Sequence, residues 1–223
     1  MFQGFSQEAV DFLWGVKFNN NREWFTAHKQ EYLDLLDKPL RELAAQLLAA
    51  MTEEFPRLGL HAHVSRIYRD ARRLYGRGPY KDHLWLVLER PSDEPGRPAF
   101  YFEIAPNYFS YGCGTWDMTA STAAKLRERI ERDPKELEKL ARRLKKSKFT
   151  LFGTEYKRPK GDVGALLNPW YNRKNHGLSF EDNCEGVLFT PELYDEILEG
   201  FRFLVPYYEF FLSLLADAEP EKM

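Results

Sequence analysis

The chain has 223 residues, of which 43% are hydrophobic and 30% are charged. This is the composition of a folded domain with a charged, solvated surface, and it excludes a largely disordered protein. No apolar run approaches the roughly 18 residues that cross a bilayer. Because the N-terminus also lacks the basic and apolar regions of a signal peptide, we expect a soluble, cytoplasmic protein with no membrane partner. The net charge is only −2, but residues 57–90 and 122–160 are basic, whereas residues 1–56 and 181–223 are acidic.

The first quarter of the chain has helical spacing. Ser6 is the expected N-cap of the first helix, because its hydroxyl can accept a backbone N–H and apolar residues follow it at helical spacing. Asn20, with Glu23 three residues later, is typical of a capping box for the next helix. Pro39 either kinks that helix or begins a new one, and Phe55-Pro56 ends the apolar stripe.

From Leu60 the apolar spacing changes to that of strands. Residues 60–68 alternate between two differently used faces, so Arg66 and Tyr68 are expected on one face and Ile67 and Arg69 on the other. The continuous apolar run 84–88 is typical of a central strand covered on both faces. Residues 99–104 and 108–112 are predicted to form two aromatic strands joined by a turn at Pro106-Asn107. We thus expect four strands, mostly antiparallel.

The C-terminal half returns to helices. Residues 120–132 and 133–148 have helical composition, and one side of the second helix is strongly basic. A short strand over 149–152 is followed by a long, ordered surface segment that ends near residue 177. Thr190 caps the final helical region, whose stripe is interrupted at Pro206. With no repeat or linker, we predict a single α+β domain over residues 1–215 and a flexible tail over 216–223. Its central, mostly antiparallel sheet has N-terminal and C-terminal helices packed around it.

The stretch from Val64 to Trp85 is the best candidate for a site, since arginines and a lysine are interleaved there with three tyrosines. Arginine binds phosphate or carboxylate through two parallel hydrogen bonds, lysine supplies a point charge, and tyrosine adds a ring and a hydroxyl. We predict a cleft that binds an anionic, phosphate- or carboxylate-bearing small molecule, and whether it also catalyses a reaction stays open. The candidate ligand-binding residues are Arg66, Arg69, Arg73, Tyr80, Lys81, His83 and Trp116.

Two other interpretations stay open. In the first, the protein is a non-catalytic scaffold, and Arg66 and Arg69 form a structural hub by pairing with carboxylates of the helices. In the second, which is weaker, the basic helices over residues 125–148 bind nucleic acid, although a solvated helix face accounts for such a run in most proteins. No pattern assigns a reaction, an oligomeric state or a biological process.

Other known chemistries do not fit the sequence. Gly76-x-Gly78 lacks the third glycine of a dinucleotide-binding turn, and no G-K-[ST] phosphate loop occurs. His61-x-His63 has no third ligand, so we predict no metal and no cofactor. Cys113 and Cys184 lack C-x-x-C spacing, which indicates two reduced thiols. The glycines that flank Cys113 predict a bulge or tight turn with a close approach of two backbones.

Two sequence elements point to a family. They are N-N-R-E-W-F at residues 20–25, and R-I-Y-R-D at 66–70 followed by P-Y-K at 79–81. With these elements the chain resembles the domain-of-unknown-function family numbered 2461, uncharacterised proteins of bacteria and fungi, over nearly its whole length. Further matching residues are Gly4-Phe5, Phe12-Leu13, Tyr32, Pro39-Leu40, His83, Gly112-x-Gly114-x-Trp116 and residues 157–161.

The resemblance implies a single α+β domain and supplies no activity, cofactor or catalytic residue. The chain departs from the family pattern at residues 73–78, where R-L-Y-G-R-G replaces the usual R-F-S-K-D-K. No role of that loop is therefore carried over to this protein.

Overall fold

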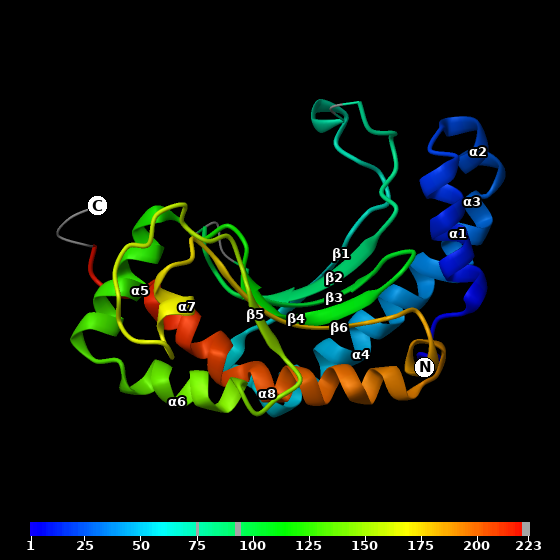
Figure 1. Cartoon of the computed structure of the whole chain (residues 1–223). Coiled ribbons are helices and arrows are strands. Elements are labelled where there is room, and N and C mark those ends of the chain that lie inside the picture. Colours follow the sequence, from blue (N-terminus) through cyan, green and yellow to red (C-terminus); the bar gives the residue numbers. More distant parts are fainter. Residues whose placement is uncertain (75, 92–94, 220–223) are drawn as a thin grey trace. The chain divides into compact units, whose positions relative to one another are not determined.

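The computed structural model describes residues 1–74, 76–91 and 95–219, and Figure 1 shows their helices and strands. The strands are β1 (His61–Val64), β2 (Leu84–Glu89), β3 (Ala99–Ile104), β4 (Phe109–Thr115), β5 (Thr150–Phe152) and β6 (His176–Asp182). They form one open antiparallel sheet in the order β1-β2-β3-β4-β6-β5. The predicted α+β class, with a sheet and helices from both ends of the chain, is confirmed.

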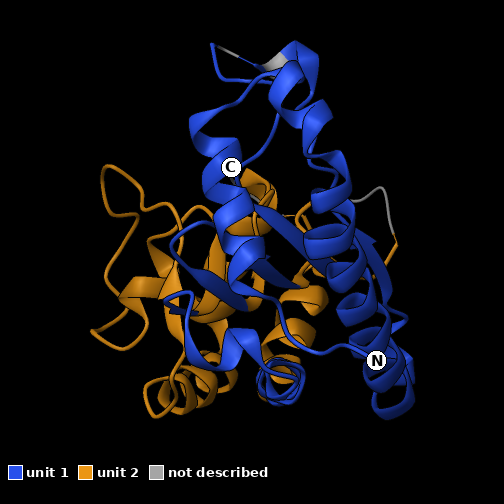
Figure 2. Ribbon diagram, turned by 90° about the vertical axis from the view of Figure 1, so that its right-hand side faces the viewer, with its two compact units in different colours: residues 1–88, 101–111, 181–200 blue, residues 89–100, 112–180, 201–223 orange. Residues whose placement is uncertain are grey.

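The chain divides into two compact units, which Figure 2 shows in different colours. Unit 1 consists of residues 1–88, 101–111 and 181–200, and unit 2 consists of residues 89–100, 112–180 and 201–223. Strands β3, β4 and β6 each have residues in both units. The predicted limits of one domain, residues 1–215, stay a prediction.

Unit 1 begins with four helices, α1 (Gln7–Phe18), α2 (Arg22–Ala27), α3 (Lys29–Tyr32) and α4 (Lys38–Glu54). The expected cap of α1 is confirmed, because the Ser6 side chain accepts a hydrogen bond from the Ala9 N–H. The capping box expected at Asn20 is wrong, since Asn21 caps α2 by accepting from the Trp24 N–H. Pro39 lies in the first turn of α4, which packs against β1 and ends before Phe55-Pro56.

The first two strands differ from their predicted form. Strand β1 ends at Val64 rather than continuing to residue 68, because Ser65 makes the last hydrogen bonds to Trp85 before the chain leaves the sheet. Burial still alternates beyond the strand, with Ile67 fully buried and Tyr68 51% exposed. Strand β2 has one buried face and one half-buried face, so the expectation that both faces are covered is wrong.

The segment between β1 and β2, residues 65–83, is the feature of unit 1 that positions the site. In Figure 1 it projects past the ends of both strands and returns along the same path, beside α1 and α2. An isolated bridge between Tyr68 and Tyr80 joins its two arms. Two further hydrogen bonds, from the Arg69 N–H to the Pro79 carbonyl and from the Lys81 N–H to the Ile67 carbonyl, close the base of the loop.

Unit 2 contains α5 (Ala120–Arg132), α6 (Lys135–Leu144), α7 (Asn168–Tyr171) and the C-terminal part of α8 (Glu192–Leu214). Strand β6 was not predicted, because its residues fall in and after the segment expected to be a surface loop. It pairs antiparallel with β5, so that Leu151 lies opposite Leu178 and Phe152 opposite Gly177. Pro206 lies inside α8, which continues past it to Leu214. No helix in the described ranges is long and apolar enough to span a membrane.

The Gly-Cys-Gly segment lies within β4, so the expected tight turn is wrong. The predicted close approach of backbones does occur, because a Cβ on Gly114 would lie 2.8 Å from the Gly177 Cα. Cys113 and Cys184 are both free thiols, and burial raises the pKa of each. Neither has the depressed pKa of a reactive thiolate.

Candidate functional site

Asn20 connects the turn between α1 and α2 to the 65–83 segment. Its amide donates a hydrogen bond to the Tyr80 carbonyl and accepts one from the Tyr80 N–H, both at 2.9 Å. Gly78 makes this contact sterically feasible, because a Cβ at that position would lie 2.2 Å from the Asn20 Oδ1. Asn20 therefore acts as a peptide-like partner for the loop instead of capping the helix.

An aromatic cluster continues this connection. The ring of Phe25, in α2, stacks on the Tyr80 ring with centroids 4.1 Å apart, and its edge contacts Tyr68 at 5.7 Å. The two tyrosine rings lie 5.4 Å apart. Phe25 and Tyr80 are buried, whereas Tyr68 is 51% exposed. The three motifs that carry the family resemblance, at residues 20–25, 66–70 and 79–81, thus meet in one cluster.

Arg69 holds the two arms of the loop together. Its Nε donates to the Tyr80 carbonyl at 2.7 Å, and its Nη2 lies 3.3 Å from the Asp82 Oδ1. The Arg69 side chain is 17% exposed and the Asp82 side chain 29% exposed. Internal bonds therefore occupy the Arg69 guanidinium, and its carboxylate partner comes from the same segment and not from the helices that the hub hypothesis names.

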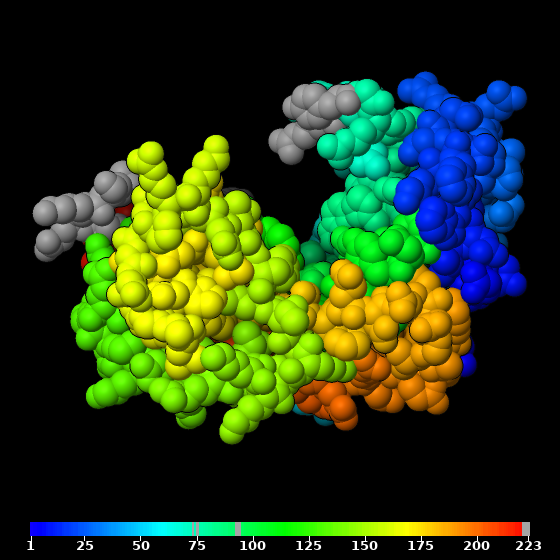
Figure 3. Space-filling view, viewed as in Figure 1, coloured from blue at the N-terminus to red at the C-terminus, as the bar shows by residue number. Residues whose placement is uncertain are grey.

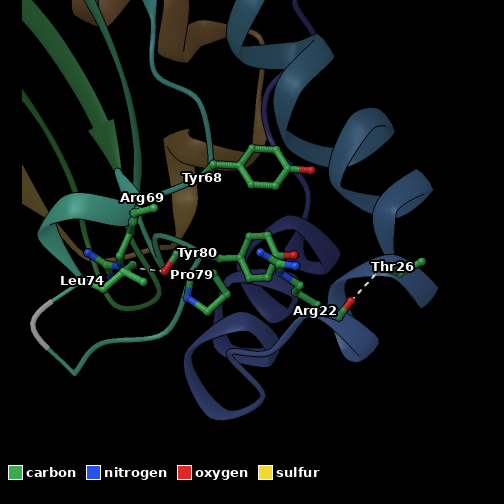
Figure 4. Close-up of a pocket in the computed structure, with 8 residues that line it drawn as sticks. Arg22, Thr26, Tyr68, Arg69, Leu74, Pro79 and Tyr80 are labelled. Atoms are coloured by element: carbon green, nitrogen blue, oxygen red, sulfur yellow. Dashed lines mark hydrogen bonds between the residues drawn. The ribbon is translucent and has the colours of Figure 1, made fainter.

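A pocket of about 350 Å³ opens between α2 and the 65–83 segment. Figure 4 shows the two tyrosine rings, Pro79 and the guanidinium of Arg22 around it. Among the described residues, those that line the pocket include two arginines and no acidic residue, and because Arg69 pairs with Asp82, the uncompensated positive charge is that of Arg22. The lining residues are Arg22, Thr26, Tyr68, Arg69, Ala71, Leu74, Pro79 and Tyr80.

Arg22 is the site residue that the sequence interpretation missed. It is exposed, and within the described part of the chain its guanidinium makes no hydrogen bond or ion pair. Figure 4 shows the guanidinium next to the Tyr80 ring. Burial and the neighbouring Tyr68 raise the pKa of Tyr80, and the positive charge of Arg22 opposes that rise. A cation at the mouth of an acid-free pocket can pair with an anionic ligand.

The hydroxyls of Tyr68 and Tyr80 complete the polar groups of the pocket. No hydrogen-bond partner for either hydroxyl occurs among the residues that the structure describes, and neither oxygen is among the buried unsatisfied atoms. Both hydroxyls are therefore open to solvent or to a ligand. Each can donate one hydrogen bond to a phosphate or carboxylate oxygen.

Lys81 and His83 form a separate cluster with Trp85. The Lys81 Nζ lies 2.5 Å from the Arg66 carbonyl and 4.0 Å from the centroid of the Trp85 ring. His83 stacks on the same indole at 5.8 Å. Burial lowers the pKa of Lys81, and the charges of Arg69 and Arg66 lower it further. The expected grouping of Lys81 and His83 is present, but neither residue lines the pocket.

Asp82 connects the two clusters. Its Oδ1 lies 3.2 Å from the His83 Nδ1 and also pairs with Arg69. Burial tends to raise the pKa of this carboxyl, but hydrogen bonds from His83 and from its own backbone, together with the nearby positive charges, hold the pKa below its usual value. Asp82 is therefore an ionised acceptor that orders the loop, and not a proton donor.

The other candidate residues lie elsewhere. Arg66 is exposed, and it contacts Lys81 through its carbonyl oxygen. The side chain of Arg73 lies outside the described part of the structure. Trp116 belongs to unit 2, follows β4 and is 44% exposed. The pocket therefore brings together two of the predicted residues, Arg69 and Tyr80.

Many cations of the basic helices have partners within unit 2. Lys125 pairs with Glu219 at 2.9 Å, Arg129 pairs with Asp217 at 2.6 Å, and Arg142 pairs with Glu138 at 2.9 Å. Arg143 lies 4.3 Å over the Phe203 ring. The α5 ion pairs hold the chain's C-terminal residues against that helix, and the Arg142–Glu138 pair lies within α6. These structural contacts account for the basic run, as expected for most such runs.

Metal-ligating groups are not clustered in the part of the chain that the structure describes. Within those ranges, no three or more His, Cys, Asp or Glu side chains lie close enough together to hold an ion. His61 and His63 are both exposed on β1.

The family resemblance is confirmed by comparison with known families. The chain belongs to the conserved hypothetical protein family DUF2461, whose model matches residues 8–210. No curated protein matches the chain. The family description names no activity.

Proposed function

We propose that this DUF2461 protein binds a small anionic ligand in the pocket between α2 and the 65–83 segment. The observation that carries the proposal is the unpaired Arg22 guanidinium beside two available tyrosine hydroxyls, in a pocket with no acidic lining residue in the described chain. Arg22 supplies the charge-assisted hydrogen bonds to a phosphate or carboxylate, and the tyrosine rings contact the ligand's apolar body. Binding in the cytoplasm, which two unpaired cysteines favour, is part of this proposal.

Arg69 has a different role from Arg22 in this proposal. Its hydrogen bonds to the Tyr80 carbonyl and to Asp82 shape the pocket wall, so it is a positioning residue. The structural-hub hypothesis and the ligand-site hypothesis thus apply to different arginines of the same pocket. The Lys81 and His83 cluster supports the loop from the other arm.

The test is the ligand-induced rise in melting temperature of the full-length protein. The probes are inorganic phosphate, phenyl phosphate and benzoate, with sodium chloride at equal ionic strength as the reference. A ligand that binds only the folded protein raises the melting temperature as its concentration exceeds its Kd. We expect phenyl phosphate to give the largest rise, because it combines an anionic group with a ring.

Variants locate the binding. Arg22→Ala is expected to keep the melting temperature of the free protein, because the side chain is exposed, and to lose the rise that phenyl phosphate causes. Arg132→Ala removes an equally exposed arginine from unit 2 and should keep the full rise. The proposal fails if no probe raises the melting temperature at millimolar concentration, or if Arg22→Ala retains the whole effect.

A further inference from the structure

A second cationic group lies in unit 2, around the ring of Tyr156. The Arg127 Cζ, the Lys160 Nζ and the Lys174 Nζ lie 5.6, 5.1 and 5.9 Å from the centroid of that ring. Any two of these charged groups are therefore at most about 12 Å apart, which is about one and a half screening lengths at physiological salt. Arg127 also donates to the Tyr156 hydroxyl at 3.1 Å.

Within the described residues no carboxylate forms an ion pair with this group, and Glu131, one helical turn from Arg127, accepts a hydrogen bond from the Tyr171 hydroxyl. Arg127, Lys160 and Lys174 have no ion pair there, and the neighbouring acids have other partners. Glu155 pairs with Arg173 at 2.9 Å, and Asp162 accepts hydrogen bonds from the Gly164 N–H and the Asn168 amide. The positive charges repel one another, so a bound polyanion would relieve a cost that the free protein carries.

Hydrogen bonds hold the segment 153–175 in one conformation. The Asn172 carbonyl accepts from the Tyr156 N–H at 3.0 Å. Its side chain accepts from the Lys160 N–H at 2.6 Å and donates to the Gly161 carbonyl at 3.0 Å. The Lys174 N–H donates to the Thr154 carbonyl at 2.7 Å. The cations are therefore carried by an ordered backbone, which lowers the entropy cost of binding.

An exposed indole belongs to the same surface. Trp116 is 44% exposed, and its carbonyl accepts a hydrogen bond from the Asn175 amide at 3.4 Å. Asn175 directly follows Lys174 and also accepts from the Thr154 N–H. Figure 3 shows the segment 153–175, coloured yellow-green to yellow, on the face of unit 2 that is turned to the viewer, with long side chains that project from it.

We propose that this surface of unit 2, formed by Arg127, Tyr156, Lys160, Lys174 and Trp116, binds single-stranded nucleic acid. Closely spaced cations along an ordered surface segment can follow a phosphate backbone, and an exposed aromatic ring can stack on a base without selecting its identity. The site differs from the proposed pocket of unit 1 and from the α5 and α6 faces whose cations have internal partners. It uses Trp116 as a stacking platform.

The test is fluorescence anisotropy of a labelled single-stranded oligonucleotide of about 12 nucleotides, a length within the known range of site sizes. Binding should weaken steeply with salt. The Lys160→Ala and Lys174→Ala variants should each bind more weakly and reduce the slope of log K against log salt by about 0.7, the contribution of one phosphate in a single strand. Arg22→Ala should bind like the wild type, which keeps this proposal separate from the first.

The Trp116 variants test the stacking contact. Trp116→Leu keeps an apolar side chain of moderate size and should weaken binding about tenfold with an unchanged salt slope, because a lost base stack removes no ionic contact. Trp116→Phe keeps a ring and should retain most of the affinity. Circular dichroism of both variants checks that unit 2 stays folded.

A matched control removes two exposed lysines of the same unit. The double variant Lys145→Ala/Lys146→Ala is compared with the double variant Lys160→Ala/Lys174→Ala, because both remove two positive charges; the first should leave binding unchanged and the second should weaken it. An equal loss of affinity in this control would overturn the assignment in favour of general attraction to unit 2. Absence of binding at low salt, or full binding by Trp116→Leu, would also overturn it.

Discussion

Two arginines contact the same pocket, and their surroundings give them different roles. Arg69 is largely buried and hydrogen-bonded to the Tyr80 carbonyl and to Asp82, whereas Arg22 is exposed and unpaired among the described residues. A buried hydrogen-bonding group that loses its partner carries the full cost of its desolvation, and an exposed one does not. Loss of the Arg69 side chain should therefore reduce stability, whereas loss of the Arg22 side chain should reduce ligand binding.

The variant Arg69→Ala should lower the free energy of unfolding by about 2 kcal/mol, because it removes the guanidinium that joins the Tyr80 carbonyl to Asp82 and leaves them only the Asn20 amide and His83 as partners. Urea titration followed by circular dichroism measures the change. Arg72→Ala is the control, since it removes an ion pair with Asp70 in which the arginine side chain is 87% exposed. Arg72→Ala should leave the free energy of unfolding unchanged. An equal loss of that free energy in both variants would contradict the expected effect of burial.

The sequence predicts Arg69 and Tyr80 because charge and aromatic density can be read along one stretch. Arg22 has no such signal, since a charged residue in the first turn of a helix is usually on a solvated face. Its importance depends on the loop that folds against α2. The only pointer was its position within the N-N-R-E-W-F element. Likewise, Asn20 and Asn21 are equally good caps by residue type, and only the contact with Tyr80 decides between them.

At the scale of elements, the contact between Asn20 and Gly78 fixes the loop against the helices. Gly78→Ala would bring a Cβ within 2.2 Å of the Asn20 side chain and displace both of its hydrogen bonds, at a cost of about 2 kcal/mol. In an Asn20→Gly background the same substitution should cost much less. A double-mutant cycle measured by urea unfolding should therefore give a clear interaction energy.

Gly76→Ala supplies the contrast within the same loop. Gly76 has a φ of +78°, and no described residue beyond its chain neighbours lies within 4 Å of an added Cβ, so its substitution costs about 1 kcal/mol through backbone strain. This cost should add to that of Asn20→Gly without coupling. Strong coupling at Gly76, or none at Gly78, would contradict the proposed packing of the loop on Asn20.

The strands show where the sequence pattern is sufficient. Residues 84–88 and 99–104 were predicted because apolar and aromatic side chains fill them. Strand β6 was missed because Gly177, Ser179 and two acidic residues interrupt its apolar pattern, and it becomes a strand through pairing with β5. The glycines of β4 predict a turn from residue type alone, but Gly114 serves the close approach of two strands. In both β4 and β6, pairing with strands that are distant in the sequence determines the structure, and local residue types do not reveal that pairing.

At the scale of the whole molecule, one buried histidine predicts how stability depends on pH. His176 is fully buried in unit 2, its Nε2 lies 2.6 Å from the Trp170 carbonyl, and its Nδ1 has no hydrogen-bond partner among the residues that the structure describes. Burial lowers its pKa from 6.5 to about 4, while the Trp170 carbonyl opposes the shift and Arg173 adds to it. The folded protein therefore holds a neutral imidazole at every pH above about 4.

Between pH 6.5 and 4 the unfolded chain binds a proton at this residue that the folded protein does not bind. The free energy of unfolding should therefore fall as the pH is lowered through this window, by about 3 kcal/mol from this residue alone. His176→Gln keeps a donor to the Trp170 carbonyl but does not titrate, so its stability should fall less. If the free energy of unfolding falls by the same amount in the wild type and the variant between pH 6.5 and 4, His176 does not titrate in this way.

If Arg22 contacts a bound anion, an NMR titration of the arginine side chains should detect the contact most directly. Protein labelled with nitrogen-15 is titrated with phenyl phosphate, and the Arg22 Nε–H resonance is assigned from its absence in Arg22→Lys. We predict a saturable shift of the Arg22 signal and no shift of the Arg132 signal. An Arg22 signal that stays unchanged while phenyl phosphate perturbs other arginines would contradict the proposed site.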